Sequence, residues 1–408
     1  MLIQVLFVAA ELAPWKKGGI SNVVQKLGNA LAAKSELRVT ILGTVPEPVR
    51  GAPEGYHQNL EFIYVRRPLK LEPWYHIQLQ SRYRAAVSQW IRQNSQGIVH
   101  FHILPGARAF SAAAAALDRT TAVALTHHDW APFEIPYYSY RWAHRLHWRM
   151  SRLLLGRFNH LVTNSDFIAS AVRASYPAPT PVVIPNGICV EEWNLKQAPA
   201  VLEGFPRILY WGALWAKKGV DILIQAFARL HVNVSRARLY IAGTGPEAKK
   251  LKAMARKLGV SAGVKFLGRV DDHNLASLIH GCDLAVFPSA YEGFGIAILE
   301  AMACGKAVIT TAHGGPSGFI SNGHDGILLP ERTSSALAES LEQLALDPER
   351  IQRLGMCARN TALRYDWSQI APAYIKFYED IVRHSYSSAG MPVKTSAIRQ
   401  SICKSQNV

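Results

Sequence analysis

The stretch that most constrains the fold runs from Asp283 to Gly318 and reads DLAVFPSAYEGFGIAILEAMACGKAVITTAHGGPSG. It opens with the short apolar run Leu284–Phe287, which a proline closes, a pattern typical of a buried parallel strand. After a glycine-rich turn, apolar residues recur at helical spacing from Ile296 until Gly305, which stands where a C-cap glycine belongs. Because Ala307–Thr310 predicts another strand, the stretch forms one strand–loop–helix–strand unit. Its loop is expected at the edge where open α/β sheets bind ligands.

Two glutamates, Glu292 and Glu300, flank the start of this predicted helix. Glu300 lies roughly 7–8 Å along the helix at a rise of about 1.5 Å per residue, so both carboxylates can reach one ligand. The helix N-terminus between them offers unpaired backbone N–H groups and a partial positive charge, which favour a phosphate. Taken singly, each glutamate is equally well explained as a solvent-exposed residue. Together they predict a site for a ligand that carries both phosphate and hydroxyl groups.

A chain of 408 residues with 49% hydrophobic and 18% charged residues suits two globular domains. No apolar run approaches the ~18–20 residues of a membrane span, and Met1–Ala10 lacks a basic n-region, so we expect no export. Five cysteines without C-x-x-C pairing argue against a disulfide framework or a zinc site and favour the cytoplasm. The net charge of +16 favours an anionic partner, although a merely soluble basic protein fits it too. No nucleic-acid module signature is present, so nucleic acid is not an expected partner.

The segment PSAYEGFGIAILEAMACGKAVITTAHGG resembles the E-x7-E signature of the family 4 retaining glycosyltransferases of the GT-B fold, with Glu292 and Glu300 as its two acids. The resemblance extends over about residues 1 to 385. It implies an α/β fold in which two Rossmann-like domains face a cleft and a C-terminal helix crosses back to the first domain. The implied parts are an acceptor-side domain, a nucleotide-sugar-binding domain, a crossover helix and a disordered tail, at residues 1–194, 207–365, 366–385 and 386–408.

Two loops of the first half extend the resemblance. The opening AAELAPWKKGGISNVVQKLGNALA resembles the start of this family and, more distantly, of bacterial glycogen synthases with their lysine-x-glycine-glycine loop. Lys16 falls at that lysine, and Gly18 and Gly19 are the paired glycines, where backbone can come close to a ligand. His128 follows the predicted strand Ala122–Leu125 and matches the family's histidine near the anomeric carbon of the donor sugar. Without the resemblance, a surface or capping histidine is the commoner explanation.

The second half carries the phosphate-side motifs. Lys218 matches the family lysine that contacts the donor pyrophosphate. Ala213 stands where many members have the arginine that partners this lysine, which leaves Lys217 or Lys16 as substitutes.

A second glycine pair, Gly314 and Gly315, is expected to hold a phosphate or a sugar hydroxyl through its backbone N–H groups. Gly318 is a further departure, because members often have a glutamate there.

The resemblance implies a set of roles. Glu300 is expected to hold ribose hydroxyls, Glu292 a hydroxyl of the donor sugar, and His128 the sugar near the reacting carbon. The implied catalytic residues are His128, Glu292 and Lys218. The implied donor-binding residues are Gly18, Gly19, Lys218, Gly243, Gly245, Glu292, Gly293, Phe294, Gly295 and Glu300. The implied acceptor-binding residues are Lys16, Arg141 and Arg145.

The segment Tyr137–Phe158 combines an arginine stripe with an adjacent apolar stripe at helical spacing. Such a basic amphipathic helix suits an anionic membrane surface, where tryptophan and leucine enter the interface and arginine meets the headgroups. A helix packed on a protein core with a solvated basic face explains the pattern equally well. Arg141 and Arg145 could alternatively grip a soluble phosphorylated acceptor.

These observations predict a metal-independent retaining hexosyltransferase without a cofactor, which moves a sugar from a nucleotide-diphosphate donor to a glycan, lipid-linked or small-molecule acceptor. For such enzymes the resemblance implies a same-face mechanism, in which the leaving phosphate itself takes the acceptor proton. Cytoplasmic placement is expected, with peripheral attachment at the inner membrane face as an option. A glycoside hydrolase also uses paired carboxylates but has no use for phosphate-seating loops. A non-catalytic sugar-nucleotide-binding protein and a nucleotide-sugar epimerase of the same fold stay open as alternatives.

Overall fold

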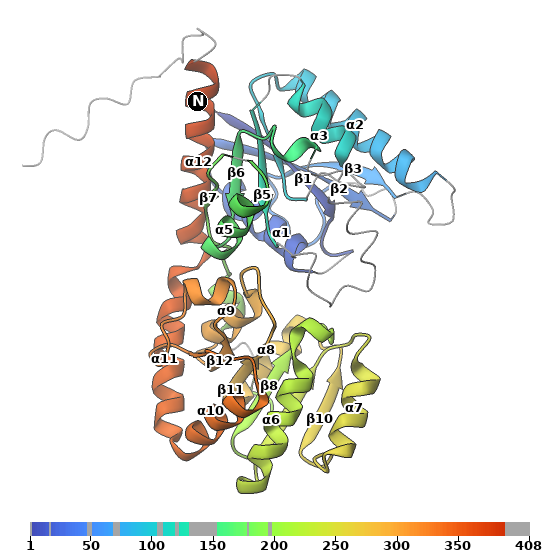
Figure 1. Cartoon of the computed structure of the whole chain (residues 1–408). Helices are drawn as coiled ribbons and strands as arrows, with labels where there is room; N and C mark the ends of the chain where they lie inside the picture. Colours follow the sequence, from blue (N-terminus) through green and yellow to red (C-terminus); the bar gives the residue numbers. More distant parts are fainter. Residues whose placement is uncertain are drawn as a thin grey trace, which may run out of the picture.

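The computed structural model describes residues 2–15, 18–46, 51–67, 74–103, 109–118, 122–129, 153–177, 179–194 and 198–387. These residues form two parallel sheets, each covered by helices, which lie one above the other in Figure 1. The α/β class and the two-domain architecture predicted from the sequence are therefore confirmed. No helix in this described part is both long and apolar enough to cross a membrane.

The first domain is built on a seven-stranded parallel sheet in the order β3-β2-β1-β4-β5-β6-β7. Its strands are β1 (Ile3–Glu11), β2 (Leu37–Val45), β3 (Glu61–Arg66), β4 (Ile98–Phe101), β5 (Ala122–His127), β6 (His160–Thr163) and β7 (Val182–Val183). Its helices are α1 (Gly19–Ala32), α2 (Tyr75–Gln93), α3 (Phe110–Leu117) and α5 (Asp166–Ser175). Side chains of β1 alternate between two apolar clusters: Phe7 packs with α1, while Leu6 packs with α2, α3 and α5.

The second domain is built on a six-stranded parallel sheet in the order β10-β9-β8-β11-β12-β13. Its strands are β8 (Arg207–Trp211), β9 (Arg238–Ala242), β10 (Val264–Gly268), β11 (Leu284–Phe287), β12 (Ala307–Thr311) and β13 (Ile327–Leu329). Its helices are α6 (Val220–Asn233), α7 (Ala248–Lys257), α8 (Asp272–Gly281), α9 (Ile296–Ala303), α10 (Ser334–Leu346) and α11 (Pro348–Arg364). The 3₁₀ turns are η1 (Val190–Trp193) before the sheet, and η2 (Ala216–Lys218) and η3 (Gly315–Gly318) within this domain. The inner strands β4, β5, β11 and β12 are buried along their whole length, which explains their near-continuous apolar sequences, whereas the edge strands β3 and β10 are partly exposed.

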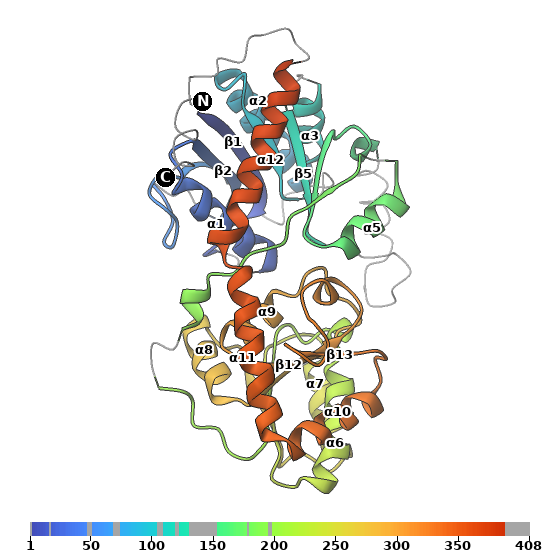
Figure 2. The same ribbon diagram turned by 90° about the vertical axis from the view of Figure 1, so that its left-hand side faces the viewer.

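The last helix, α12 (Trp367–Ser387), returns to the first domain, as the sequence predicted. In Figure 2, α11 and α12 run almost end to end along the two domains. The chain crosses between the domains twice, and the two crossings pair through an isolated bridge between Ile188 and Asp366. The Trp367 indole packs on Gly187, where any Cβ would lie 2.4 Å from the ring. Tight packing thus joins the two crossings at one place.

Candidate active site

The loop after β11 is held in shape by backbone contacts. Glu292 forms an isolated parallel bridge with Gly314, and the Gly315 N–H donates a hydrogen bond of 2.8 Å to the Glu292 carbonyl. Gly314 has a φ of +112°, and a Cβ there would lie 2.3 Å from the Glu292 oxygen. The sequence analysis expected this glycine pair to hold a ligand; at Gly315 that expectation needs correction, because its N–H supports the loop instead.

Glu292 and Lys218 form a tight pair. The Lys218 Nζ lies 2.7 Å from Glu292 Oε1, and the Ser289 hydroxyl donates to the same oxygen at 2.6 Å. Burial on its own would raise the pKa of Glu292, but the charge and hydrogen bond of Lys218, with smaller contributions from Ser289 and Lys217, bring the pKa below its ordinary value. Glu292 is therefore a carboxylate at neutral pH, and its charge is matched by the lysine.

His128 lies just past the end of β5 and is backed by a second histidine. His102 Nδ1 and His128 Nε2 are 3.2 Å apart, and the two rings are stacked. Burial lowers the pKa of His128 to about 4. The imidazole that borders the site is therefore neutral at pH 7.

The two domains meet beside this histidine. Within the first domain, the Asn164 side chain donates to the His128 carbonyl at 2.8 Å. Between the domains, the Ser165 hydroxyl donates to the Gly293 carbonyl at 2.7 Å. A Cβ on Gly293 would lie 2.7 Å from the His128 carbonyl oxygen. The glycine at this position thus permits the loop that carries Glu292 to approach His128.

A central cavity with a volume of about 610 Å³ lies between the two domains. The first domain contributes Gly18, Gly19, His128 and Asp129, and the second contributes the loops after β8 and β11 with the start of α9. Of the residues that the sequence analysis assigned to the site, this cavity brings together Gly18, Gly19, His128, Lys218, Glu292, Gly293, Phe294 and Gly295.

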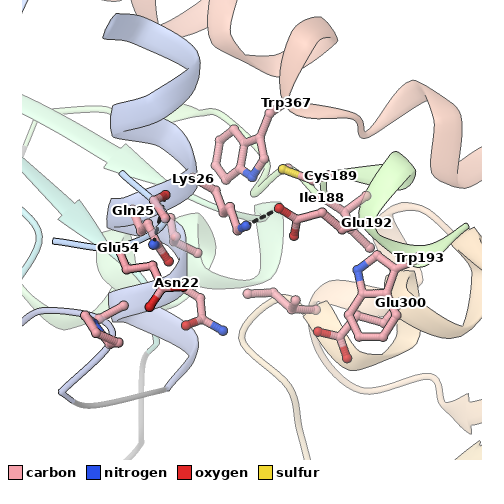
Figure 3. Close-up of a pocket in the computed structure, with 16 residues that line it drawn as sticks. Asn22, Gln25, Lys26, Glu54, Ile188, Cys189, Glu192, Trp193, Glu300 and Trp367 are labelled. Carbon is pink, nitrogen blue, oxygen red and sulfur yellow. Dashed lines mark hydrogen bonds and ion pairs between the residues drawn. The ribbon is translucent and has the colours of Figure 1, made fainter. Parts of the chain in front are cut away.

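Glu300 faces a second space, the linker cavity, with a volume of about 390 Å³. Figure 3 shows its walls, which include Lys26 and Glu192 joined by an ion pair. The Glu300 carboxylate accepts a hydrogen bond of 2.9 Å from the Trp211 indole N–H. Ile296, the first residue of α9, lines both cavities, so Glu292 borders the central cavity and Glu300 the adjoining linker cavity.

A third space, the β8 cavity, extends from the central cavity along the end of β8 and has a volume of about 340 Å³. Gly212 and Ala213 line both of these cavities, and Gly243 and Arg269 line the β8 cavity. Gly245 is not among the lining residues of the three cavities. It packs on Leu214, where a Cβ would lie 2.4 Å from the backbone oxygen.

Three of the sequence-assigned residues, Lys16, Arg141 and Arg145, lie outside the described residues. The sequence analysis missed Ser289, Trp211 and His102, which hold Glu292, Glu300 and His128. Trp211 and His102 meet their partners only through the fold, and Ser289 does so only through the shape of its turn. The one sequence signal for these residues was their position at the end of a predicted strand. Among the described residues, no group of three or more histidine, cysteine or acidic side chains is arranged to hold a metal ion.

Two family models match adjoining parts of the chain. The model described as Glycosyltransferase Family 4 matches residues 17–192, and that described as Glycosyl transferases group 1 matches residues 191–361. The chain belongs to the family 4 glycosyltransferases. The predicted family is thereby confirmed.

Relatives and solved structures agree with this family. Glycogen synthase from Mycobacterium tuberculosis is 35% identical over 197 residues, which cover 48% of this chain and 47% of the relative. Sucrose-phosphate synthase from Thermosynechococcus elongatus has a TM-score of 0.78 at 19% identity, covering 94% of this chain and 100% of that one. HepE from Anabaena, solved with UDP and glucose, has a TM-score of 0.72 at 21% identity, covering 92% and 99%. The matches thus span about half the length of the curated relative, while the solved structures share the GT-B fold throughout.

Two residues, Ala213 and Gly318, differ from those that many members of the family have at these positions. Ala213 presents only a methyl group to the central cavity, and its carbonyl accepts a hydrogen bond of 3.0 Å from the Tyr210 hydroxyl. Gly318 lies in η3, and a Cβ there would meet nothing within 4 Å. Sterically, Gly318 could be replaced by a larger residue, so packing does not explain its lack of a side chain.

Proposed function

We propose that this protein is a retaining glycosyltransferase that moves a hexose from a nucleotide-diphosphate donor to an acceptor hydroxyl. The observation that carries the proposal is the central cavity, where the Lys218–Glu292 pair, neutral His128 and the α9 N-terminus surround one space. The donor diphosphate would lie at Lys218 and the α9 N–H groups, which stabilise the negative charge that grows on the leaving group. Glu292 would accept a hydrogen bond from a hydroxyl of the donor sugar.

The neutral state of His128 suits a place beside the reacting carbon. Positive charge grows on the sugar as the bond to phosphate breaks, and a neighbouring imidazolium would oppose it. Because burial lowers the pKa of His128 to about 4, the ring can offer a hydrogen bond without that repulsion. The departing phosphate oxygen would take the acceptor proton on the same face, and the product would retain the donor's anomeric configuration.

The proposed chemistry uses lysine and backbone N–H groups where another enzyme would use a metal ion, so turnover is expected to persist in EDTA. The test supplies UDP-, GDP- and ADP-glucose with a mixture of glycan acceptors and follows both nucleotide release and the anomeric proton of the product by NMR. An epimerase would change the donor without an acceptor. A non-catalytic binding protein would bind the nucleotide and release nothing.

Removing either Lys218, placed at the diphosphate, or Glu300, placed at the ribose, is expected to weaken nucleotide binding. Lys218→Ala and Glu300→Ala each delete a charge-assisted hydrogen bond, which should raise the Kd about 10- to 100-fold. Calorimetry with UDP, GDP and ADP measures this. Lys249→Ala, which changes an exposed lysine on α7, is the matched control and should bind as the wild type does. Unchanged affinity in both site variants would contradict the assignment.

We place the acceptor at a membrane surface, on a lipid-linked molecule. The basic stretch Tyr137–Phe158 supports this, although only its end is described, where Leu155 and Phe158 are buried and Leu153 is 70% exposed. On the same domain, α2 carries no acidic residue, and Trp74 beside its N-terminus is 64% exposed. Aromatic and basic groups together suit an anionic interface.

Changing Arg141, Arg145 and Arg149 to glutamate is expected to abolish sedimentation with anionic vesicles, because each arginine near such a surface contributes about 1 kcal/mol. Salt at 1 M should also release the wild type, since the Debye length falls to about 3 Å. The charge-matched control changes Lys249, Arg256 and Lys257 on α7 to glutamate and should keep most of the binding. Equal binding by wild type and the first variant, or binding by neither, contradicts the membrane placement.

A further inference from the structure

An ion pair crosses the central cavity from one domain to the other. The Nζ of Lys217, in η2 of the second domain, lies 3.6 Å from Oδ2 of Asp129, which follows β5 and His128 in the first domain. Both residues line the central cavity. The ammonium group is therefore placed beside Lys218, at the space where the proposed donor would lie.

Lys217 is fixed to the loop that carries Glu292. Its carbonyl accepts a hydrogen bond of 2.7 Å from the Ala290 N–H, and its Nζ lies 4.9 Å from the centre of the Tyr291 ring. The Lys217 side chain is only 14% exposed. An ammonium with so little access to water needs an anion nearby.

The two carboxylates that face the two lysines differ in their access to water. Glu292, the partner of Lys218, is 18% exposed and receives a second hydrogen bond from Ser289. Asp129 is 43% exposed and lies at the longer distance from its lysine. Asp129 can therefore return to solvent at a smaller cost than Glu292 can.

A diphosphate needs more positive charge than the described lining of the cavity offers while both ion pairs are intact. The charges of these lining residues sum to zero, because two lysines (Lys217, Lys218) face two carboxylates (Asp129, Glu292) and His128 is neutral. Ala213 adds no charge to this wall. Exchange of Asp129 for a phosphate oxygen would supply a cation and remove a nearby repulsive carboxylate.

We propose that Lys217 is a second ligand of the donor diphosphate, and that Asp129 holds its place across the cleft until the donor displaces it. This inference rests on the proposed function. It makes Asp129 an internal competitor of the diphosphate, so the two members of one ion pair must affect donor affinity in opposite directions. It also couples donor binding to the loss of one contact between the domains.

The experiment is calorimetry of UDP, ADP and GDP binding to the wild type and to Lys217→Ala, Lys217→Arg, Asp129→Asn and Lys218→Ala. Lys217→Ala should raise the Kd about 10- to 100-fold, and Lys217→Arg should restore most of the affinity. Asp129→Asn should lower the Kd by about two- to fivefold, as expected for loss of a partly exposed pair. In the double variant Lys217→Ala/Asp129→Asn, most of the gain from Asp129→Asn should disappear, because no lysine is left to release and only the loss of carboxylate repulsion remains.

Far-UV circular dichroism and thermal melting establish that each variant is folded, and Lys249→Ala controls for the loss of a lysine elsewhere in the domain. Wild-type affinity in Lys217→Ala, or weaker binding in folded Asp129→Asn, overturns the inference. If Lys218→Ala loses nucleotide binding but Lys217→Ala does not, the proposed function stands and Lys217 is not a ligand of the diphosphate. Failure of the wild type to bind any of the three nucleotides contradicts the proposed function, and the inference with it.

Discussion

Glu292→Gln is expected to lower kcat by about 100- to 1000-fold, the range seen when one preorganised group that stabilises a transition state is removed. Glutamine keeps the shape of the side chain but loses the charge that now faces Lys218 at 2.7 Å. The freed Lys218 ammonium can still attract the diphosphate, so nucleotide affinity should be unchanged or higher. A fall in kcat without a fall in nucleotide affinity would distinguish the role of Glu292 at the sugar from that of Lys218, whose loss is expected to weaken nucleotide binding. Steady-state kinetics and calorimetry on the same protein preparation measure the two quantities.

His128→Ala provides a companion measurement, since this residue is also placed at the reacting sugar and should lower kcat more than nucleotide affinity. Glu339→Gln, on the exposed face of α10, makes the same chemical change away from the cavity and should have wild-type kinetics. If Glu292→Gln and His128→Ala both turn over at the wild-type rate, the catalytic placement is wrong.

The first domain is expected to lose stability steeply as the pH falls from about 6.5 to 5. His100 and His127 are at most 1% exposed, and burial lowers the pKa of each to about 3. Since an unfolded histidine has a pKa of about 6.5, the unfolded chain binds more protons in this window, and acid favours unfolding. At pH 5 each of the two costs about 2 kcal/mol, so together they remove about 4 kcal/mol from a total that is typically about 5–15 kcal/mol. Burial also lowers the pKa of His102, which adds to the same effect.

Hydrogen exchange followed by mass spectrometry at pH 7.5 and pH 5, corrected for the intrinsic rates, resolves the two domains and measures this loss. The control variant His127→Gln offers an amide that can still bond to the Tyr176 hydroxyl, now 2.8 Å from the imidazole, but cannot titrate. It should reduce the difference in unfolding free energy between the two pH values by about 2 kcal/mol. Equal stability of the wild-type first domain at both pH values contradicts the prediction.

The elements that the sequence specified best are those with local stop signals. The strand Leu284–Phe287 and the helix beginning at Ile296 have the predicted bounds, because a proline and a glycine mark their ends. After the first glycine pair, the helical spacing of apolar residues predicts a helix from about Ser21 to Ala33, but α1 begins at Gly19, because its N-cap Gly18 offers no side-chain cap to read. Such shifts of one or two residues leave the placement of the site unchanged.

The arrangement of the site was less accessible to sequence reasoning. The positions of Glu292, Lys218 and His128 around one cavity follow from parallel strands that end at the same edge of each sheet, so their proximity could be anticipated. The direct pairing of Lys218 with Glu292, 74 positions apart, depends on two loop conformations and had no sequence signal. The same holds for Asp129, which reaches Lys217 only because the two domains face each other.

The α12 helix has a consequence for how the protein is made. Its side chains Tyr374, Tyr378 and Ile381 are fully buried in the core of the first domain, although the ribosome makes them only after the second domain. Between the end of β7 and this helix roughly 200 residues must be added, which takes about 10–40 s at about 5–20 residues per second. The second domain contains its own apolar cluster and needs no part of α12, so it can fold during that interval. Of the two domains, the one that is made first is therefore completed last, and until then the apolar surface that α12 covers, next to α1, is exposed to water.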